Sequence, residues 1–148
     1  MTNGKLFGLA LLGSASLIAG SVFAQASADG GRKFQTSMIG AAEVPGPGDA
    51  DGTGTASIMV NPGQKRVCFE LTVANIATAT AAHIHRGDTT VAGPVVVGLD
   101  APADGDSSGC KDVTRELALE ILKDPAAFYV NVHNADFPNG AIRGQLAK

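Results

Sequence analysis

The residues of this chain best suited to chemistry are its three histidines, and two of them form the segment His83-Ile84-His85. In a β-strand, residues i and i+2 point to the same face of the sheet. Both imidazoles can therefore reach one metal ion at a bond length of about 2 Å, while Ile84 points to the opposite face. We expect that opposite face to be the core.

The third histidine, His133, ends the segment Tyr129-Val130-Asn131-Val132-His133 and lies on the face opposite to the two valines. If the two strands are neighbours, the three imidazoles converge, and shared bonds of about 2 Å place their nitrogens about 3 to 4 Å apart. An all-nitrogen site suits copper, or alternatively zinc, better than calcium or magnesium. The other interpretation is a hydrogen-bonded cluster with no native metal.

The elements that must position these histidines are predicted to be mainly β-strands. The chain has 148 residues, 45% of them hydrophobic, and 19 glycines with 7 prolines, which favours one domain of short strands joined by many turns. The formal net charge is −3 and no basic run occurs, so nucleic acid is not an expected partner. Alternating apolar residues and turn signals predict seven strands, over residues 33–39, 55–60, 67–73, 80–85, 95–97, 128–134 and 141–146.

These strands predict an all-β fold, a β-sandwich or flattened barrel. The strand Val95–Val97 is expected to be buried, and the residues from Asp100 to Asp112 are expected to form a long polar loop. One short helix is predicted between Thr114 and Lys123, where apolar residues recur at helical spacing and Pro125 follows the end. It is expected to cover the sheet.

The first residues indicate export. Lys5 precedes the apolar stretch Leu6–Ala19, and small residues follow where a signal peptidase cleaves, after Ala24 or Ala26. We therefore predict a signal peptide over residues 1–24, a flexible lead-in over 25–32 and one domain over 33–148. The mature protein is expected in the periplasm or secreted, with no membrane attachment. The alternative is an uncleaved membrane anchor, which is disfavoured because glycines and serines dilute the apolar stretch and about 20 apolar residues are normally needed.

Cys68 and Cys110 are the only two cysteines of the chain. Outside the cytoplasm thiols oxidise, so the simplest prediction is a disulfide between them. The alternative, a thiolate metal ligand or a reactive pair, is disfavoured because the spacing is unlike a C-x-x-C unit and no base adjoins either residue.

Several segments together resemble the CHRD domain, the module named from chordin. They are Ala41–Pro45, Ala82–Gly87 with Ala92–Val96, Tyr129–Asn134 and Phe137–Leu146, in this order, and the match extends from about Lys33 to Leu146. The resemblance implies the fold class more directly than an activity. It leaves two functions open: copper binding through the three histidines, and a non-catalytic extracellular module that interacts with other proteins.

The same segments also resemble copper–zinc superoxide dismutase, an eight-stranded Greek-key β-barrel. In this resemblance His83 and His85 match a pair of copper ligands, His133 matches a later ligand, and Arg143 is similar to an arginine that attracts superoxide. No histidine remains for a zinc site. The resemblance implies a copper centre without zinc. Copper handling is favoured over superoxide chemistry, in which Arg143 would be a catalytic residue. Alternatively, Arg143 is a surface charge paired with a carboxylate such as Asp136.

Overall fold

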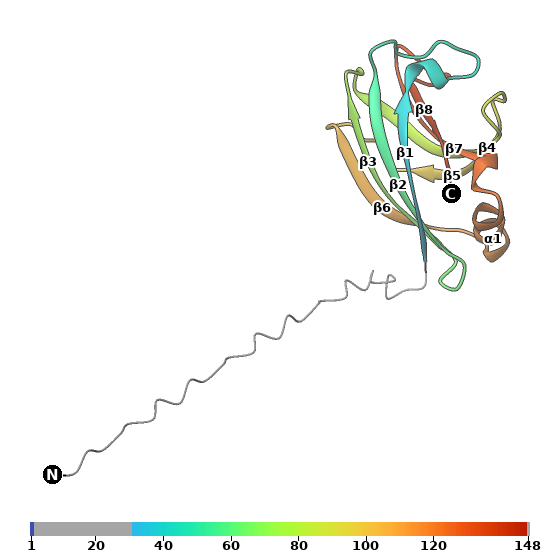
Figure 1. Cartoon of the computed structure of the whole chain (residues 1–148). Helices are drawn as coiled ribbons and strands as arrows, with labels where there is room; N and C mark the ends of the chain where they lie inside the picture. Colours follow the sequence, from blue (N-terminus) through green and yellow to red (C-terminus); the bar gives the residue numbers. More distant parts are fainter. Residues whose placement is uncertain (2–30, 148) are drawn as a thin grey trace.

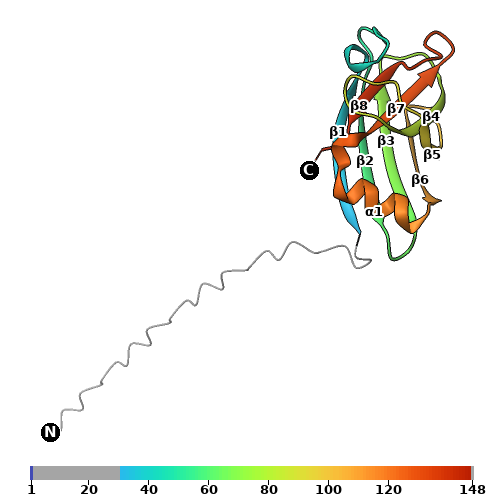
Figure 2. The same ribbon diagram turned by 90° about the vertical axis from the view of Figure 1, so that its right-hand side faces the viewer.

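The structure is a computed structural model that describes residue 1 and residues 31–147 (Figures 1 and 2). Apart from residue 1, the predicted signal peptide and the lead-in as far as residue 30 lie outside the described residues. Eight strands, one α-helix and two short 3₁₀ helices make up the described part: β1 Arg32–Ile39, η1 Gly40–Ala42, β2 Thr53–Asn61, β3 Arg66–Ala74, β4 Ala79–Arg86, β5 Val95–Leu99, β6 Asp106–Asp112, α1 Arg115–Lys123, η2 Pro125–Ala127, β7 Phe128–Asn134 and β8 Ile142–Gln145.

All strand pairs are antiparallel, in the order β5-β4-β7-β8-β1-β2-β3-β6. The two end strands, β5 and β6, lie against each other and nearly close the sheet into a barrel. The Lys111 ammonium lies 2.6 Å from the Asp100 carboxylate across this seam, and the Ser107 hydroxyl donates to the Asp100 carbonyl. Strands β4, β5 and β6 are neighbours in this order around the barrel, and the chain then returns so that β7 pairs with β4. This arrangement of four strands is a Greek key. The predicted all-β barrel class is confirmed.

The core lies inside this barrel and is built by the alternation of the strands. In β3, the residues Val67, Phe69 and Leu71 are buried while the residues between them are not, as the period of two predicts. Helix α1 adds Ala118 and Ile121 to the same core from a position beside the β2–β3 hairpin (Figure 2). The predicted covering helix is confirmed.

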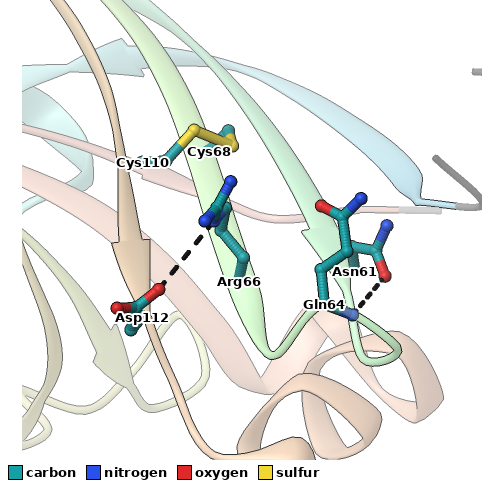
Figure 3. A network of polar contacts seen from close by, with 6 residues as sticks. All are labelled: Asn61, Gln64, Arg66, Cys68, Cys110 and Asp112. Carbon is teal, nitrogen blue, oxygen red and sulfur yellow. Dashed lines mark hydrogen bonds and ion pairs between the residues drawn. A yellow bond between two sulfur atoms is a disulfide. The ribbon is translucent and has the colours of Figure 1, made fainter.

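Strand β6 corrects one prediction, because the residues from Asp100 to Asp112 are not all loop. Polar residues and glycine dominate Asp106–Asp112, so hydrophobic alternation gives no signal there. The segment is a strand because it pairs with β3 along its whole length, with Cys68 directly opposite Cys110. The disulfide between these cysteines is confirmed, and Figure 3 shows it beside the Arg66–Asp112 ion pair.

Two smaller predictions are also wrong. Val95 is half exposed, because β5 stands at the end of the strand order and only its Val97 and Leu99 are buried. Arg32 belongs to β1 rather than to a lead-in, since it pairs with Val60 of β2. Among the described residues, no helix has the length and apolar character needed to cross a membrane.

Candidate metal centre

The three histidines meet on the outer face of the paired strands β4 and β7. In this pairing His133 stands opposite Ala81, and His83 stands opposite Asn131. Ile84, between the two histidines of β4, is fully buried in the core, as predicted. The register of one strand pair therefore brings together residues that are 50 positions apart in the chain.

The ligand nitrogens of the cluster all lie within 4.8 Å of one another. One separation, from His83 Nδ1 to His133 Nε2, is 3.2 Å and lies within the predicted range of about 3 to 4 Å. The widest separation exceeds that range. Bonds of about 2 Å to one ion would require the more widely separated rings to move closer by on the order of 1 Å.

Two backbone carbonyls orient the rings of His85 and His133. His85 Nδ1 lies 2.9 Å from the Gly93 carbonyl oxygen, and His133 Nδ1 lies 3.1 Å from that of Pro138. A carbonyl oxygen can only accept, so each Nδ1 carries the proton and each Nε2 keeps a lone pair. Such contacts are typical of the partners that orient metal-bound histidines. In the metal-free protein the proton of His83 Nδ1 is donated to His133 Nε2.

His85 Nε2 is buried and has no hydrogen-bond partner within the described part of the chain. The residue is only 9% exposed, and its ring stacks on Tyr129 with the centroids 4.8 Å apart and the planes 8° from parallel. A buried lone pair without a partner is costly, because water that would have satisfied it is excluded. A cation bound at this position would remove the cost.

The electrostatics of the cluster favour the neutral form of the imidazoles. Burial lowers the pKa of all three histidines below 6.5, and the other two histidines lower the pKa of His83 further. The hydrogen bonds to Gly93 and Pro138 raise the pKa values of His85 and His133, but burial outweighs them. Neutral imidazole is the form that binds a metal.

Arg143 is on β8, one strand beyond β7, and is not a surface charge. It is 2% exposed, and its guanidinium donates to the backbone carbonyls of Asp88 and Val91 rather than to Asp136. The guanidinium carbon also lies 3.4 Å from the centroid of the Tyr129 ring. The predicted ion pair with Asp136 is therefore wrong, whereas the catalytic role remains a prediction.

A buried carboxyl group that sequence reasoning did not assign to the site lies next to the cluster. Both oxygens of Glu43 accept from Asn131 Nδ2, at 2.9 and 2.8 Å, and Glu43 is 6% exposed. Burial raises the pKa of Glu43 to about 7, although Asn131 and Arg143 lower it. A side chain at Gly140 would collide with this carboxyl group, and Gly140 has a φ of +142°. The only sequence signal was that Glu43 lies in a segment resembling the CHRD domain.

Fold and site together define a class of protein: an all-β Greek-key domain with a three-histidine cluster on its outer face. Comparison with models of known families found a match to the CHRD domain over residues 34–146. This match covers most of the chain, so the protein belongs to the CHRD domain family. Searches of curated proteins and of solved structures found no match.

Proposed function

We propose that this CHRD-domain protein is exported and binds one copper ion through His83, His85 and His133. The observation that carries the proposal is the buried, unpartnered Nε2 of His85, which faces no donor while two further imidazoles lie close by. A histidine cluster serving only the fold would pair this nitrogen, because orphaned buried acceptors destabilise proteins. Export is supported by the disulfide, which belongs to oxidising compartments.

Copper is proposed ahead of zinc because three imidazoles without a carboxylate or thiolate suit Cu(I) and Cu(II), and copper binds more tightly to a given nitrogen site. Bound copper would supply reversible one-electron chemistry. We favour copper handling over superoxide turnover, because the nearby Arg143 guanidinium already donates to two carbonyls and is buried away from solvent. Superoxide turnover, with Arg143 attracting the anion, is the second candidate.

The first experiment measures bound metal after the purified protein is equilibrated with equal amounts of copper and zinc. We expect about one copper per chain. His85→Ala is expected to weaken copper binding by about 100-fold, since one of three ligands is lost and the other two remain. Because the chain has only three histidines, all imidazole-dependent binding belongs to this cluster.

Asp136→Asn is the matched control, because it alters an exposed carboxylate in the loop that follows His133 and is expected to leave copper binding unchanged. Zinc bound in preference to copper, at the same histidines, would correct the metal. Absence of any bound metal in the folded wild-type protein would overturn the proposal and favour an interaction module.

Copper affinity is expected to be nearly constant from pH 8 down to about pH 6.5 and to fall only below it. The pKa of each histidine is lowered from 6.5, so protons compete with the metal only in more acidic solution than for free imidazole. Isothermal titration at several pH values, with a buffer that does not bind copper, measures this profile. A decline that begins near pH 8 would contradict it.

A further inference from the structure

The loop of residues 87–94, between β4 and β5, connects Arg143 to His85. Its Gly93 carbonyl accepts the His85 Nδ1 proton, and its Asp88 and Val91 carbonyls accept from the Arg143 guanidinium. We propose that Arg143 is a positioning residue: it holds this loop so that Gly93 keeps the proton on His85 Nδ1 and leaves Nε2 free for the metal. The part of this inference that concerns metal binding rests on the proposed function.

The chemistry of arginine suits this role. Arg143 Nη1 donates to the Val91 carbonyl at 2.9 Å, Nη2 donates to the Asp88 carbonyl, and Nη2 lies 3.3 Å from Gln145 Oε1. A planar guanidinium can hold two carbonyls at once, which a single ammonium cannot do with the same geometry. Since the guanidinium is buried, losing it would leave two carbonyls of the loop without these donors.

Tyr129 contacts both Arg143 and His85, the two residues that the loop connects. Its hydroxyl accepts from the Gly93 backbone N–H at 3.0 Å, its ring stacks on His85, and the Arg143 guanidinium packs against the same ring. A Cβ added at Gly93 would lie 1.6 Å from the Arg86 carbonyl oxygen, so the backbone leaves no room for a side chain at this position. The loop, the Tyr129 ring and the His85 ring are thus packed as one unit. The direction of the Gly93 carbonyl within it depends on Arg143.

The test compares Arg143→Met and Arg143→Lys with the wild-type protein. In metal-free protein at pH 8, imidazole ¹⁵N chemical shifts should show one His85 tautomer for wild type, with the proton on Nδ1, and a mixture for Arg143→Met. Copper affinity is expected to fall about tenfold in Arg143→Met, in the range known for residues that orient metal ligands. The Cu(II) paramagnetic resonance spectrum is expected to change as well.

Arg143→Lys separates charge from geometry. It keeps the positive charge but lacks the planar fork that holds both carbonyls in this geometry, so we expect the same tautomer mixture and spectral change with a smaller loss of affinity. Arg86→Met is the matched control: it also removes one positive charge, and Arg86 follows His85, but its side chain pairs with Glu120 at a half-exposed site. That variant should keep the wild-type tautomer.

A folded Arg143→Met protein with the wild-type tautomer and copper affinity within twofold of wild type would overturn the inference. If Arg143→Met does not fold, Arg143→Lys decides by the same measurements, and wild-type values for it would overturn the inference as well. If the wild-type protein binds no copper, the proposed function is overturned. The positioning role is still tested in that case, by the His85 tautomer of the metal-free protein.

Discussion

Replacing Cys68 and Cys110 together by serine is expected to lower the free energy of unfolding by about 4 kcal/mol. The disulfide joins residues 42 positions apart, and closing a loop of that length restricts the unfolded chain by about this amount in the chain-entropy model. Within the fold, the loss should be felt first in β6, because its polar residues bury little apolar surface against β3. Guanidinium denaturation of the oxidised wild type and the double variant measures the difference.

Ser108→Ala is the control for this prediction, since Ser108 is an exposed residue of the same strand, opposite Glu70. It should alter the stability by no more than about 0.5 kcal/mol. Amide hydrogen exchange should show that β6 opens before β2 and β3 in the double variant. Equal stability of the oxidised wild type and the double variant would show that strand pairing alone holds β6.

Glu43 is expected to make the protein less stable as the pH rises. Its pKa is about 7 when folded and 4.5 as a free side chain, so between these values the folded protein holds a proton that the unfolded chain has lost. Stability from this group is complete below pH 4.5 and is lost as the pH rises through 7. At 1.36 kcal/mol for each pKa unit, the loss amounts to about 3 kcal/mol.

Glu43→Gln should remove this dependence. A glutamine is uncharged at every pH and still offers one oxygen to Asn131 Nδ2, so the variant should be more stable than wild type at pH 8 by about 2 to 3 kcal/mol and nearly equal to it at pH 4.5. Urea denaturation at both pH values measures this. Glu70→Gln removes an exposed carboxylate and serves as the control. Parallel pH profiles of wild type and Glu43→Gln would contradict the prediction.

The contact between Glu43 and Asn131 also explains why one buried oxygen beside the histidines has no hydrogen-bond partner in the described structure. Asn131 Oδ1 is buried with no hydrogen-bond partner in the described structure, while Nδ2 faces the carboxyl group. When Glu43 is protonated, a half-turn of the amide lets Oδ1 accept from the carboxyl O–H. Because Asn131 lies between Tyr129 and His133 on the outer face of β7, the state of Glu43 is linked to the packing of the candidate metal centre.

Local patterns in the sequence were sufficient for several conclusions. The alternation around His83 and His85 places both on one face of a strand, because successive side chains of a strand point to opposite faces. The apolar residues of β3 and of α1 could be found for the same reason, since their periods of 2 and 3.6 reflect burial on one side. With two cysteines, only one disulfide within the chain was possible.

Other features depended on contacts between distant segments and could be decided only by the tertiary structure. Strand β6 has no hydrophobic pattern and forms because β3 offers it a partner. The sequence left open whether Arg143 is a surface charge or a residue of the site, whereas in the structure the 87–94 loop folds over it and receives its hydrogen bonds. The carbonyls that orient His85 and His133 belong to Gly93 and Pro138, and a backbone carbonyl carries no sequence signal.

The candidate metal centre, too, was determined partly by the sequence and partly by the tertiary structure. The sequence alone determined that the chain has three imidazoles and that each opposes an apolar strand face, because this depends on neighbours one or two residues away. Whether His133 meets His83 and His85 depended on the pairing of β4 with β7 and on its register, in which a shift of one residue would move His133 to the other face. That register is set by packing of the whole core, so only the folded chain decides it.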